Sequence, residues 1–270
     1  MSNAPTAIVV RAAGTNCDQE MVRAFSMAGA TPSLVHLDQL IRDPAALDRF
    51  DLIGFAGGFS YGDDCGAGRV QAVRVREHLL TPLREAVDRG VPVIGACNGF
   101  QVLVQTGLLP GPAEEPWDPA HQPVALAANA GARFIDDWVR VRFEPDSVCV
   151  WTRGLAEAHD LAPEAMMLPI AHGEGRFVAS SERVVHALES SGQVALRYVD
   201  NVNGSEAAIA GICDVSGRVL GLMPHPERYL SWHNHPFWTR LGPAQRRGDA
   251  LGLRMFKNAV AAAAPHAALR

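Results

Sequence analysis

The sequence lacks any block of basic residues, and its net charge of −5 and pI of about 6.0 offer no cationic surface to a polyanion. Binding to nucleic acid or to an anionic membrane therefore has no support. The chain also lacks an apolar run of roughly 18 residues, the minimum for a transmembrane helix. Residues 1–6 contain neither the basic segment nor the apolar core of a secretory signal. We expect a cytoplasmic protein with no nucleic-acid or membrane partner.

Cysteine is sparse, and its spacing excludes the common zinc motifs. The five cysteines, at positions 17, 65, 97, 149 and 213, form no Cys-x-x-Cys pair. This spacing predicts neither a metal site nor a disulfide framework, so the expected metal content of the chain is none. Four of the five are expected to be reduced, partly buried thiols. The exception is Cys97, which lies between Gly95 and Gly99.

Length and composition favour one large α/β domain. The 270 residues are 48% hydrophobic, enough for a substantial core, and we expect residues 1–270 to form a single domain. Asp18 is expected to cap a first helix, and a second is predicted over about 70–89. Apolar runs predict strands at 7–10, 33–37, 51–56 and 91–94. Strands that alternate with helices predict a three-layer, mostly parallel sheet with helices on both faces.

The regular alternation stops after residue 108. Residues 108–123 contain five prolines and residues 231–247 are rich in Trp, His, Pro and Arg, so both are expected to be irregular insertions. A closing helix is expected from Asp249 to about Ala262. Strands are predicted at 133–143, 148–151, 166–170 and 194–199, and a hairpin at 209–214 and 218–223.

Cys97 lies at the apex of a predicted strand–turn–helix, in the segment Gly95-Ala96-Cys97-Asn98-Gly99-Phe100-Gln101. The pattern Gly-x-Cys-x-Gly is the thiol form of the nucleophile elbow, in which a sharp turn lifts the nucleophile from the top of a sheet. Glycine is needed on both sides because a Cβ would clash where the chain reverses. The following helix places its positive end at the sulfur and favours thiolate over thiol. A buried structural cysteine requires none of these features, so we interpret Cys97 as a nucleophile.

His225 is the histidine that its sequence context best suits to act as the base for Cys97. Prolines on both sides hold it extended in Pro224-His225-Pro226-Glu227. Residues two apart in an extended segment point the same way, so we expect His225 and Glu227 side by side at the carboxyl end of a strand. A carboxylate beside an imidazole fixes its tautomer and stabilises its charged form. Taken alone, this segment could equally be a surface turn with an incidental His and Glu.

Two backbone N–H donors for an oxyanion are expected beside Cys97. One belongs to Asn98, and the other comes from the loop 57–62 that directly follows the strand at 51–56. Three glycines in this loop let the backbone approach a ligand closely. The same glycines leave the peptide orientation unfixed, so we expect a partner to order the loop. An ordinary glycine turn is the alternative for Gly57 and Gly58 alone.

Five motifs occur in the order seen in one family. They are Gly-Gly-Phe-Ser-Tyr-Gly-Asp at 57–63, Cys-Asn-Gly-Phe-Gln at 97–101, Ala-His-Gly-Glu-Gly-Arg-Phe at 171–177, Asn-Gly-Ser at 203–205 and Met-Pro-His-Pro-Glu-Arg at 223–228. The chain resembles the glutaminase subunits of phosphoribosylformylglycinamidine synthase, which are triad-type class I glutamine amidotransferases of purine biosynthesis. The resemblance covers about residues 7–260 and implies a flavodoxin-like fold.

By this resemblance, Cys97 attacks the side-chain amide of glutamine, His225 moves the proton and Glu227 orients His225. The family passes the ammonia to a larger synthase subunit, which uses ATP and magnesium to convert formylglycinamide ribonucleotide to the amidine. A small accessory subunit often joins this complex, and no cofactor is expected in the present chain. The substrate-binding residues that the resemblance implies are Gly57, Gly58, Phe59, Asn98, Gln101, Arg133, Phe134 and His172.

The segment from Asn129 to Phe134 departs from the family pattern Asn-x-Ser-x-Arg-Phe, because Gly131 replaces the serine. Any hydroxyl contact at this position is lost. Cys65 adds a second thiol near the predicted site and has no assigned role. For His172 and Glu174, a site contact, a partner contact and a structural hydrogen bond remain open.

Two other classes of protein fit part of this pattern. A free-standing cysteine hydrolase, such as a γ-glutamyl hydrolase or a small peptidase, would share the fold and turn over without a partner. A degenerate binding subunit is disfavoured because nucleophile, base and orienting carboxylate are all present. A glutaminase assay with and without the cognate synthase subunit distinguishes the amidotransferase subunit from the free-standing hydrolase.

Overall fold

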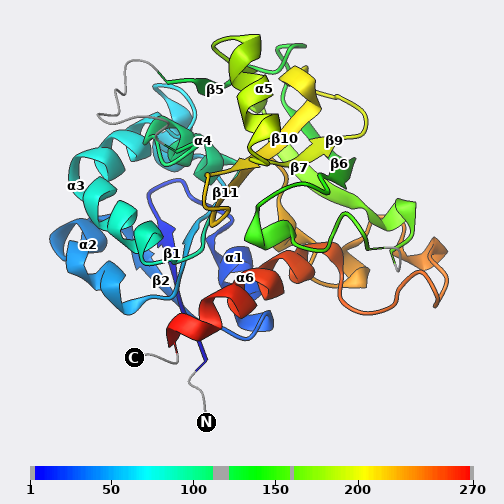
Figure 1. Cartoon of the computed structure of the whole chain (residues 1–270), viewed down its shortest axis with the longest axis horizontal. Helices are drawn as coiled ribbons and strands as arrows, with labels where there is room; N and C mark the ends of the chain where they lie inside the picture. The colour runs from blue at the N-terminus through cyan, green and yellow to red at the C-terminus, as the bar shows by residue number, and fades with distance from the viewer. Residues whose placement is uncertain (1–3, 112–121, 159–160, 268–270) are drawn as a thin grey trace.

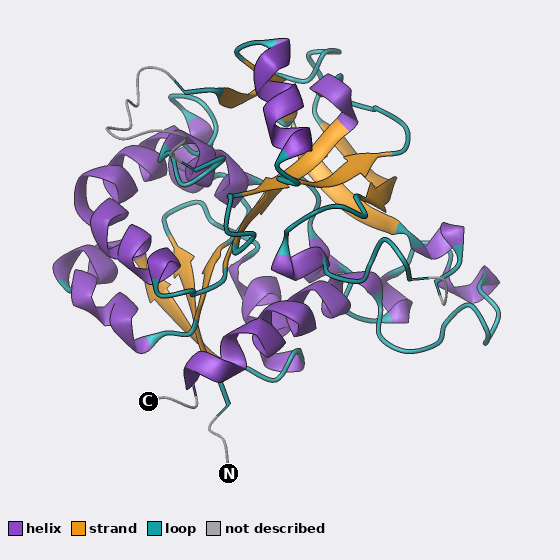
Figure 2. Ribbon diagram, viewed as in Figure 1, coloured by secondary structure: helices purple, strands orange, loops and turns teal. Residues whose placement is uncertain are grey.

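A mixed nine-stranded sheet forms the centre of the molecule, in the order β2-β1-β3-β4-β11-β10-β9-β6-β7 (Figures 1 and 2). The computed structural model describes residues 4–111, 122–158 and 161–267, and only the backbone of 264–267. Neighbouring strands from β2 to β11 are parallel, and those from β11 to β7 are antiparallel. The strands are β1 (Thr6–Arg11), β2 (Thr31–His36), β3 (Leu52–Phe55), β4 (Val93–Ala96), β6 (Ile135–Phe143), β7 (Met167–His172), β9 (Val194–Tyr198), β10 (Ile209–Cys213) and β11 (Val219–Leu222).

Helices cover both faces of the parallel half, as the sequence predicts (Figure 1). Along β1, Ala7 and Val9 pack with one group of helices, whereas Ile8 and Val10 pack with the other. Both faces of these strands are therefore apolar, which is typical of parallel sheets. The first group contains α1 (Asp18–Met27) and α6 (Leu251–Ala267), and the second contains α2 (Leu37–Arg42), α3 (Arg69–Asp88) and α4 (Asn98–Gln105).

Helix α1 buries Met21, Ala24 and Phe25, which share one face at helical spacing. Asp18 is not its cap, which corrects the prediction. The N-cap is Cys17, and the Asp18 carboxylate lies in the first turn, where it pairs with Arg11 at 3.2 Å. A carboxylate in the first turn still stabilises the helix through its dipole.

The strand predicted at 148–151 is wrong, because Val150–Thr152 form a 3-10 turn. Its backbone N–H groups bond to turns, with Val148 donating to Gly192 and Val150 to Gly217. The run is apolar because it packs in the core. Trp151 is fully buried and lies edge-on to Phe256 of α6. Burial in a turn produces the same apolar signal as a short buried strand.

The sequence does not predict helix α2, helix α5 (Glu182–Ser190) or the two-stranded sheet of β5 (Val124–Ala127) and β8 (Arg176–Ala179). Helix α2 begins at Leu37, inside the run predicted as strand, because His36 and Gln39 form a capping box. Helix α5 fully buries only Leu188. Short elements with little buried surface give weak periodicity.

Residues 231–247 contain two 3-10 turns, at Trp232–Asn234 and Trp238–Arg240, and all of them are described. His235 attaches this segment to the sheet, because its ring lies 5.9 Å from that of Trp138 in β6. Its Nε2 also lies 2.8 Å from the carbonyl oxygen of Glu164. The other predicted insertion, 108–123, falls mainly on residues 112–121, which lie outside the described residues.

The carboxyl ends of β1, β3, β4 and β11 meet at one edge of the parallel half, where α/β proteins bind their ligands. The segments that follow these strands carry Cys17, Gly57, Cys97 and His225, respectively. The end of β7 brings His172 to the same region. None of the described helices combines the length and the apolar character that a membrane span requires.

Candidate active site

Cys97 has the elbow geometry predicted for it. It stands between β4 and α4 with φ 50° and ψ −105°, a conformation that non-glycine residues rarely adopt. Its N–H donates to the carbonyl of Leu222 in β11 at 2.8 Å, which fixes the turn to the sheet. A Cβ on Gly99 would lie 2.0 Å from the carbonyl oxygen of Phe55. Glycine is required there because the first turn of α4 presses against β3.

His225 and Glu227 form a buried pair, with 2.6 Å between Nδ1 of the imidazole and Oε1 of the carboxylate. The expected pairing is present, but its geometric reason differs from the prediction. Only His225 precedes the turn, and Pro226–Arg228 form a 3-10 turn that brings the carboxylate back to the ring. The N–H of His225 donates to the carbonyl of Pro169 at 2.8 Å, so β7 also holds this residue in place.

The electrostatic surroundings of His225 favour its protonated form. Burial lowers the pKa of His225, but the negative charges of Glu227 and Cys97 more than offset this effect and hold the pKa well above its usual value. The ring packs on Gly57, where a Cβ would lie 2.7 Å from Cε1 of the imidazole. Nε2 has no protein partner among the described residues. It remains able to exchange a proton.

The N–H of Phe59 is not an oxyanion donor, because it donates to the carbonyl of Gly14 at 3.0 Å. The described residues offer no acceptor to the N–H of Gly58. Asn98 opens α4, so its N–H has no acceptor within the helix. Among the described residues, the N–H groups of Gly58 and Asn98 therefore remain as candidate donors near Cys97.

The loop 57–62, which carries the oxyanion donor Gly58, is fixed by the neighbouring loop after β1. This is contrary to the expectation that its glycines leave it unordered. Cys17 donates its N–H to the carbonyl of Gly57 at 3.1 Å, and Tyr61 donates to Ala13 at 2.6 Å. Gly58 has φ +139°, and a Cβ there would lie 2.6 Å from the backbone nitrogen of Asn16. Here glycine permits close packing between two loops.

A cavity of about 210 Å³ opens beside Cys97. Its wall includes five of the predicted substrate-binding residues: Gly58, Phe59, Gln101, Phe134 and His172. Phe59 and Phe134 are half exposed, with ring centres 6.2 Å apart. The three other predicted residues do not line it: Gly57 lies behind the His225 ring, Asn98 lies beneath the loop, and the exposed Arg133 contributes its carbonyl to Asn129.

Two carboxylates also line this cavity: Glu174, whose role the sequence left open between a site contact, a partner contact and a structural hydrogen bond, and Asp63, which the sequence did not single out. Burial raises the pKa of Asp63, and the charge of Glu174 adds to the effect. The amide of Gln101 braces this wall, since it accepts from Asn98 and donates to the backbone carbonyl of Glu174. Both acids lie inside the motifs that carry the family resemblance, and this position is the sequence feature that could have identified them as site residues.

His172 is neutral in this site. Burial and the nearby charge of His225 lower the pKa of His172 to about 4. Its Nδ1 lies 3.1 Å from Oδ1 of Asn129, which can only accept, so Nδ1 carries the hydrogen. Nε2 is then an acceptor, and it has no protein partner among the described residues. His172 combines a structural hydrogen bond with a place in the cavity wall.

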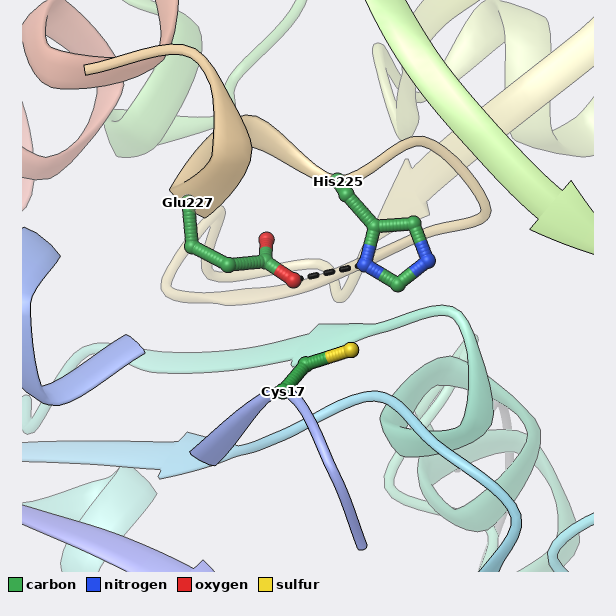
Figure 3. Close-up of side chains that lie close together, drawn as sticks. All are labelled: Cys17, His225 and Glu227. Carbon is green, nitrogen blue, oxygen red and sulfur yellow. Dashed lines mark hydrogen bonds and ion pairs between the residues drawn. The ribbon is translucent and has the colours of Figure 1, made fainter. Parts of the chain in front are cut away.

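Cys17 is a second thiol at the site that spacing could not identify. Figure 3 shows its sulfur beside the hydrogen bond that joins His225 to Glu227. Possible ligand atoms of these three buried residues all lie within 4.8 Å of one another. Arg228 donates to the Cys17 sulfur from Nη2 at 3.0 Å.

Comparison with known proteins gives consistent matches over nearly the whole chain. Residues 4–261 match the family described as the CobB/CobQ-like glutamine amidotransferase domain. The chain is 40% identical to phosphoribosylformylglycinamidine synthase subunit PurQ of Dehalococcoides mccartyi over 259 residues, which is 94% of this chain and 95% of that one. It is 41% identical to the subunit of the same name from Mycobacterium bovis over 248 residues, covering 91% and 92%.

Solved structures agree with these matches. The structure of PurLQS from Thermotoga maritima contains a chain that is 32% identical, with a TM-score of 0.69 and coverage of 96% of this chain and 99% of that one. The glutaminase domain of Trypanosoma brucei CTPS with bound acivicin is 16% identical, with a TM-score of 0.52 and coverage of 97% and 94%. The second similarity concerns the fold alone.

Proposed function

This chain belongs to the CobB/CobQ-like glutamine amidotransferase family, among its PurQ-type members, and we propose that it is the glutaminase subunit of a phosphoribosylformylglycinamidine synthase. It hydrolyses glutamine to glutamate and ammonia. The observation that carries this proposal is the buried His225–Glu227 pair beside an elbow cysteine that opens into a cavity. We further propose that residues 1–270 act as one cytoplasmic glutamine amidotransferase domain.

In the first half-reaction, the Cys97 thiolate adds to the side-chain amide carbon of glutamine. The oxygen becomes negatively charged, and the N–H groups of Gly58 and Asn98 stabilise it. His225 then gives its Nε2 proton to the amide nitrogen, the carbon–nitrogen bond breaks, and ammonia leaves a glutamyl thioester on Cys97. Glu227 balances the charge of the imidazolium throughout.

In the second half-reaction, water replaces ammonia. Neutral His225 takes a proton from the water, the hydroxyl adds to the thioester carbon, and the same two N–H groups hold the oxyanion. The carbon–sulfur bond breaks, Cys97 leaves as a thiolate, and glutamate departs. No metal or cofactor of this chain takes part in either step.

The ammonia goes to a larger, ATP-dependent synthase subunit, with a small accessory subunit in the complex. We propose this arrangement because the similar chain from Thermotoga maritima comes from a structure described as PurLQS. The partner uses ATP and magnesium to convert formylglycinamide ribonucleotide to formylglycinamidine ribonucleotide in IMP synthesis. A free-standing cysteine hydrolase has less support, since the relatives described above carry the names of synthase subunits.

Steady-state release of glutamate and ammonia tests the proposed function. The chain should form the two products in equal amounts, and the assembled complex should convert formylglycinamide ribonucleotide with glutamine as the nitrogen donor. A well-assembled complex that forms the amidine only from added ammonium salt would contradict the proposal.

A further inference from the structure

Cys17, His225 and Glu227 form a donor cluster that glutamine hydrolysis does not fully use. The reaction needs the imidazole and the carboxylate, but it gives the Cys17 sulfur no task. The three side chains are each at least nine-tenths buried, and they come from segments more than two hundred residues apart. Figure 3 shows the sulfur, the imidazole and the carboxylate converging on one small region.

The chemistry of this donor set matches that of a zinc site. Thiolate, imidazole and carboxylate are the three protein ligand types of Zn²⁺, and sites with three protein ligands leave a fourth position for water. Zinc–ligand bonds of about 2.0–2.3 Å hold tetrahedral ligand atoms about 3.3–3.8 Å apart. The ligand atoms here lie within 4.8 Å of one another. Zinc binding would require the Nδ1–Oε1 pair, now 2.6 Å apart, to open to this spacing.

A positive group already occupies part of this region. The Arg228 guanidinium donates from Nη2 to the Cys17 sulfur at 3.0 Å. The same side chain is about one-third exposed, and its Nε lies 3.7 Å from Glu20. Arg228 can therefore swing towards Glu20 and solvent when another cation binds the sulfur. It would act as a competitor of the metal.

We propose that Cys17, His225 and Glu227 bind a zinc ion, and that this ion inhibits the glutaminase. Binding replaces the Nδ1 hydrogen of His225 and the thiol hydrogen of Cys17, and both protons go to solvent. The metal-bound imidazole loses its hydrogen bond to Glu227. It can no longer form the imidazolium that donates a proton to the leaving ammonia. The inhibitory consequence rests on the proposed function, whereas binding itself does not.

The direct test measures zinc affinity in a Cys97→Ser chain, which keeps the proposed site and removes the nucleophile as a competing ligand. Competition with a chromophoric chelator should show one zinc ion per chain. Adding Cys17→Ser should weaken binding at least about tenfold, whereas Cys65→Ser, which alters an exposed thiol, should leave it unchanged. Adding Arg228→Met should tighten binding, because the competing cation is lost.

Cobalt provides a second readout that does not depend on affinity. Co²⁺ bound to the Cys97→Ser chain should show thiolate-to-metal charge-transfer absorption, and the band should disappear with Cys17→Ser. Equal zinc affinity, or an unchanged cobalt band, in folded chains with and without Cys17 would overturn the proposal.

The inhibition is tested on the full-length chain with Cys97 intact. Zinc should suppress glutamate release, EDTA should restore it, and Cys17→Ser should raise the inhibition constant at least about tenfold relative to its own uninhibited rate. An unchanged inhibition constant would place the inhibitory zinc on Cys97 and refute the proposal. A chain that binds zinc through Cys17 but never hydrolyses glutamine would refute the proposed function and leave the site intact.

Discussion

Replacing Glu227 with glutamine removes the charge beside His225 and keeps the size of the side chain. The carboxylate lies 2.6 Å from Nδ1 of the imidazole, and both groups are buried. The amide oxygen of glutamine can still accept from Nδ1–H, so the ring orientation is retained. The substitution therefore isolates the electrostatic part of the interaction.

The expected loss follows from the strength of this hydrogen bond. A bond to a charged group contributes about 1.5–3 kcal/mol, which corresponds to a loss of about 10- to 150-fold in kcat/KM if it acts mainly in the transition state. His225→Ala removes the proton carrier itself and should cost more, because general acid–base catalysis contributes about 10²–10⁴-fold. Glu227→Gln should therefore be the milder of the two.

The pH profile gives the sign of the effect. Glu227 raises the pKa of His225, so its removal lowers that pKa. The first half-reaction needs protonated His225, and its rate falls as pH rises through this pKa. The basic limb of the kcat/KM profile should therefore move to lower pH in Glu227→Gln.

The assay is initial-rate glutamate release across pH 5–10, with thermal unfolding to confirm that the variant is folded. Glu20→Gln is the matched control, because Glu20 lies 3.7 Å from Arg228 and, among the described residues, forms no hydrogen bond or ion pair with the imidazole. Its effect should stay within about threefold. A folded Glu227→Gln chain with an unchanged rate and an unchanged basic limb would refute the assigned role of the carboxylate.

Three further predictions concern other parts of the site. Cys97→Ala in the assembled complex should abolish glutamine-dependent synthesis and retain synthesis from ammonium salt; loss of both in an intact complex would contradict the division of labour. Gly99→Ala should destabilise the chain by about 1–3 kcal/mol, because its Cβ would lie 2.0 Å from the carbonyl oxygen of Phe55, whereas Gly131→Ala should not, since nothing lies within 4 Å; equal melting temperatures would refute the packing argument. His172→Asn should raise the KM for glutamine without moving the pH profile between 5 and 8, because a group with a pKa of about 4 does not titrate there; a shifted profile would assign His172 to proton transfer.

The sequence predicted the local parts of the site well. Gly95, Cys97 and Gly99 form one short pattern, and the close packing that requires these glycines involves the elbow and the strand beside it. The pairing of His225 with Glu227 was predicted for a different reason, since a 3-10 turn and not an extended segment brings them together. Residues two apart can meet in either conformation, so the pattern alone could not distinguish the two.

Contacts between distant segments could not be predicted. The N–H of Phe59 donates a hydrogen bond to the carbonyl of Gly14. The Cys17 sulfur accepts a hydrogen bond from Arg228, which lies 211 positions later in the chain. Nothing in the spacing of the cysteines indicates such a contact. The apolar run at 148–151 shows the converse limit, because a buried turn around Trp151 and a buried strand give the same pattern.

The most direct measurement of the central claim is active-site labelling. A diazo or chloroketone analogue of glutamine, added at low excess to the native chain, should alkylate Cys97 and leave the other four cysteines free, as read by peptide mass mapping. Glutamine should protect Cys97 from the label. Labelling of the exposed Cys65 or of Cys17 while Cys97 stays free would contradict the assignment of Cys97 as the nucleophile.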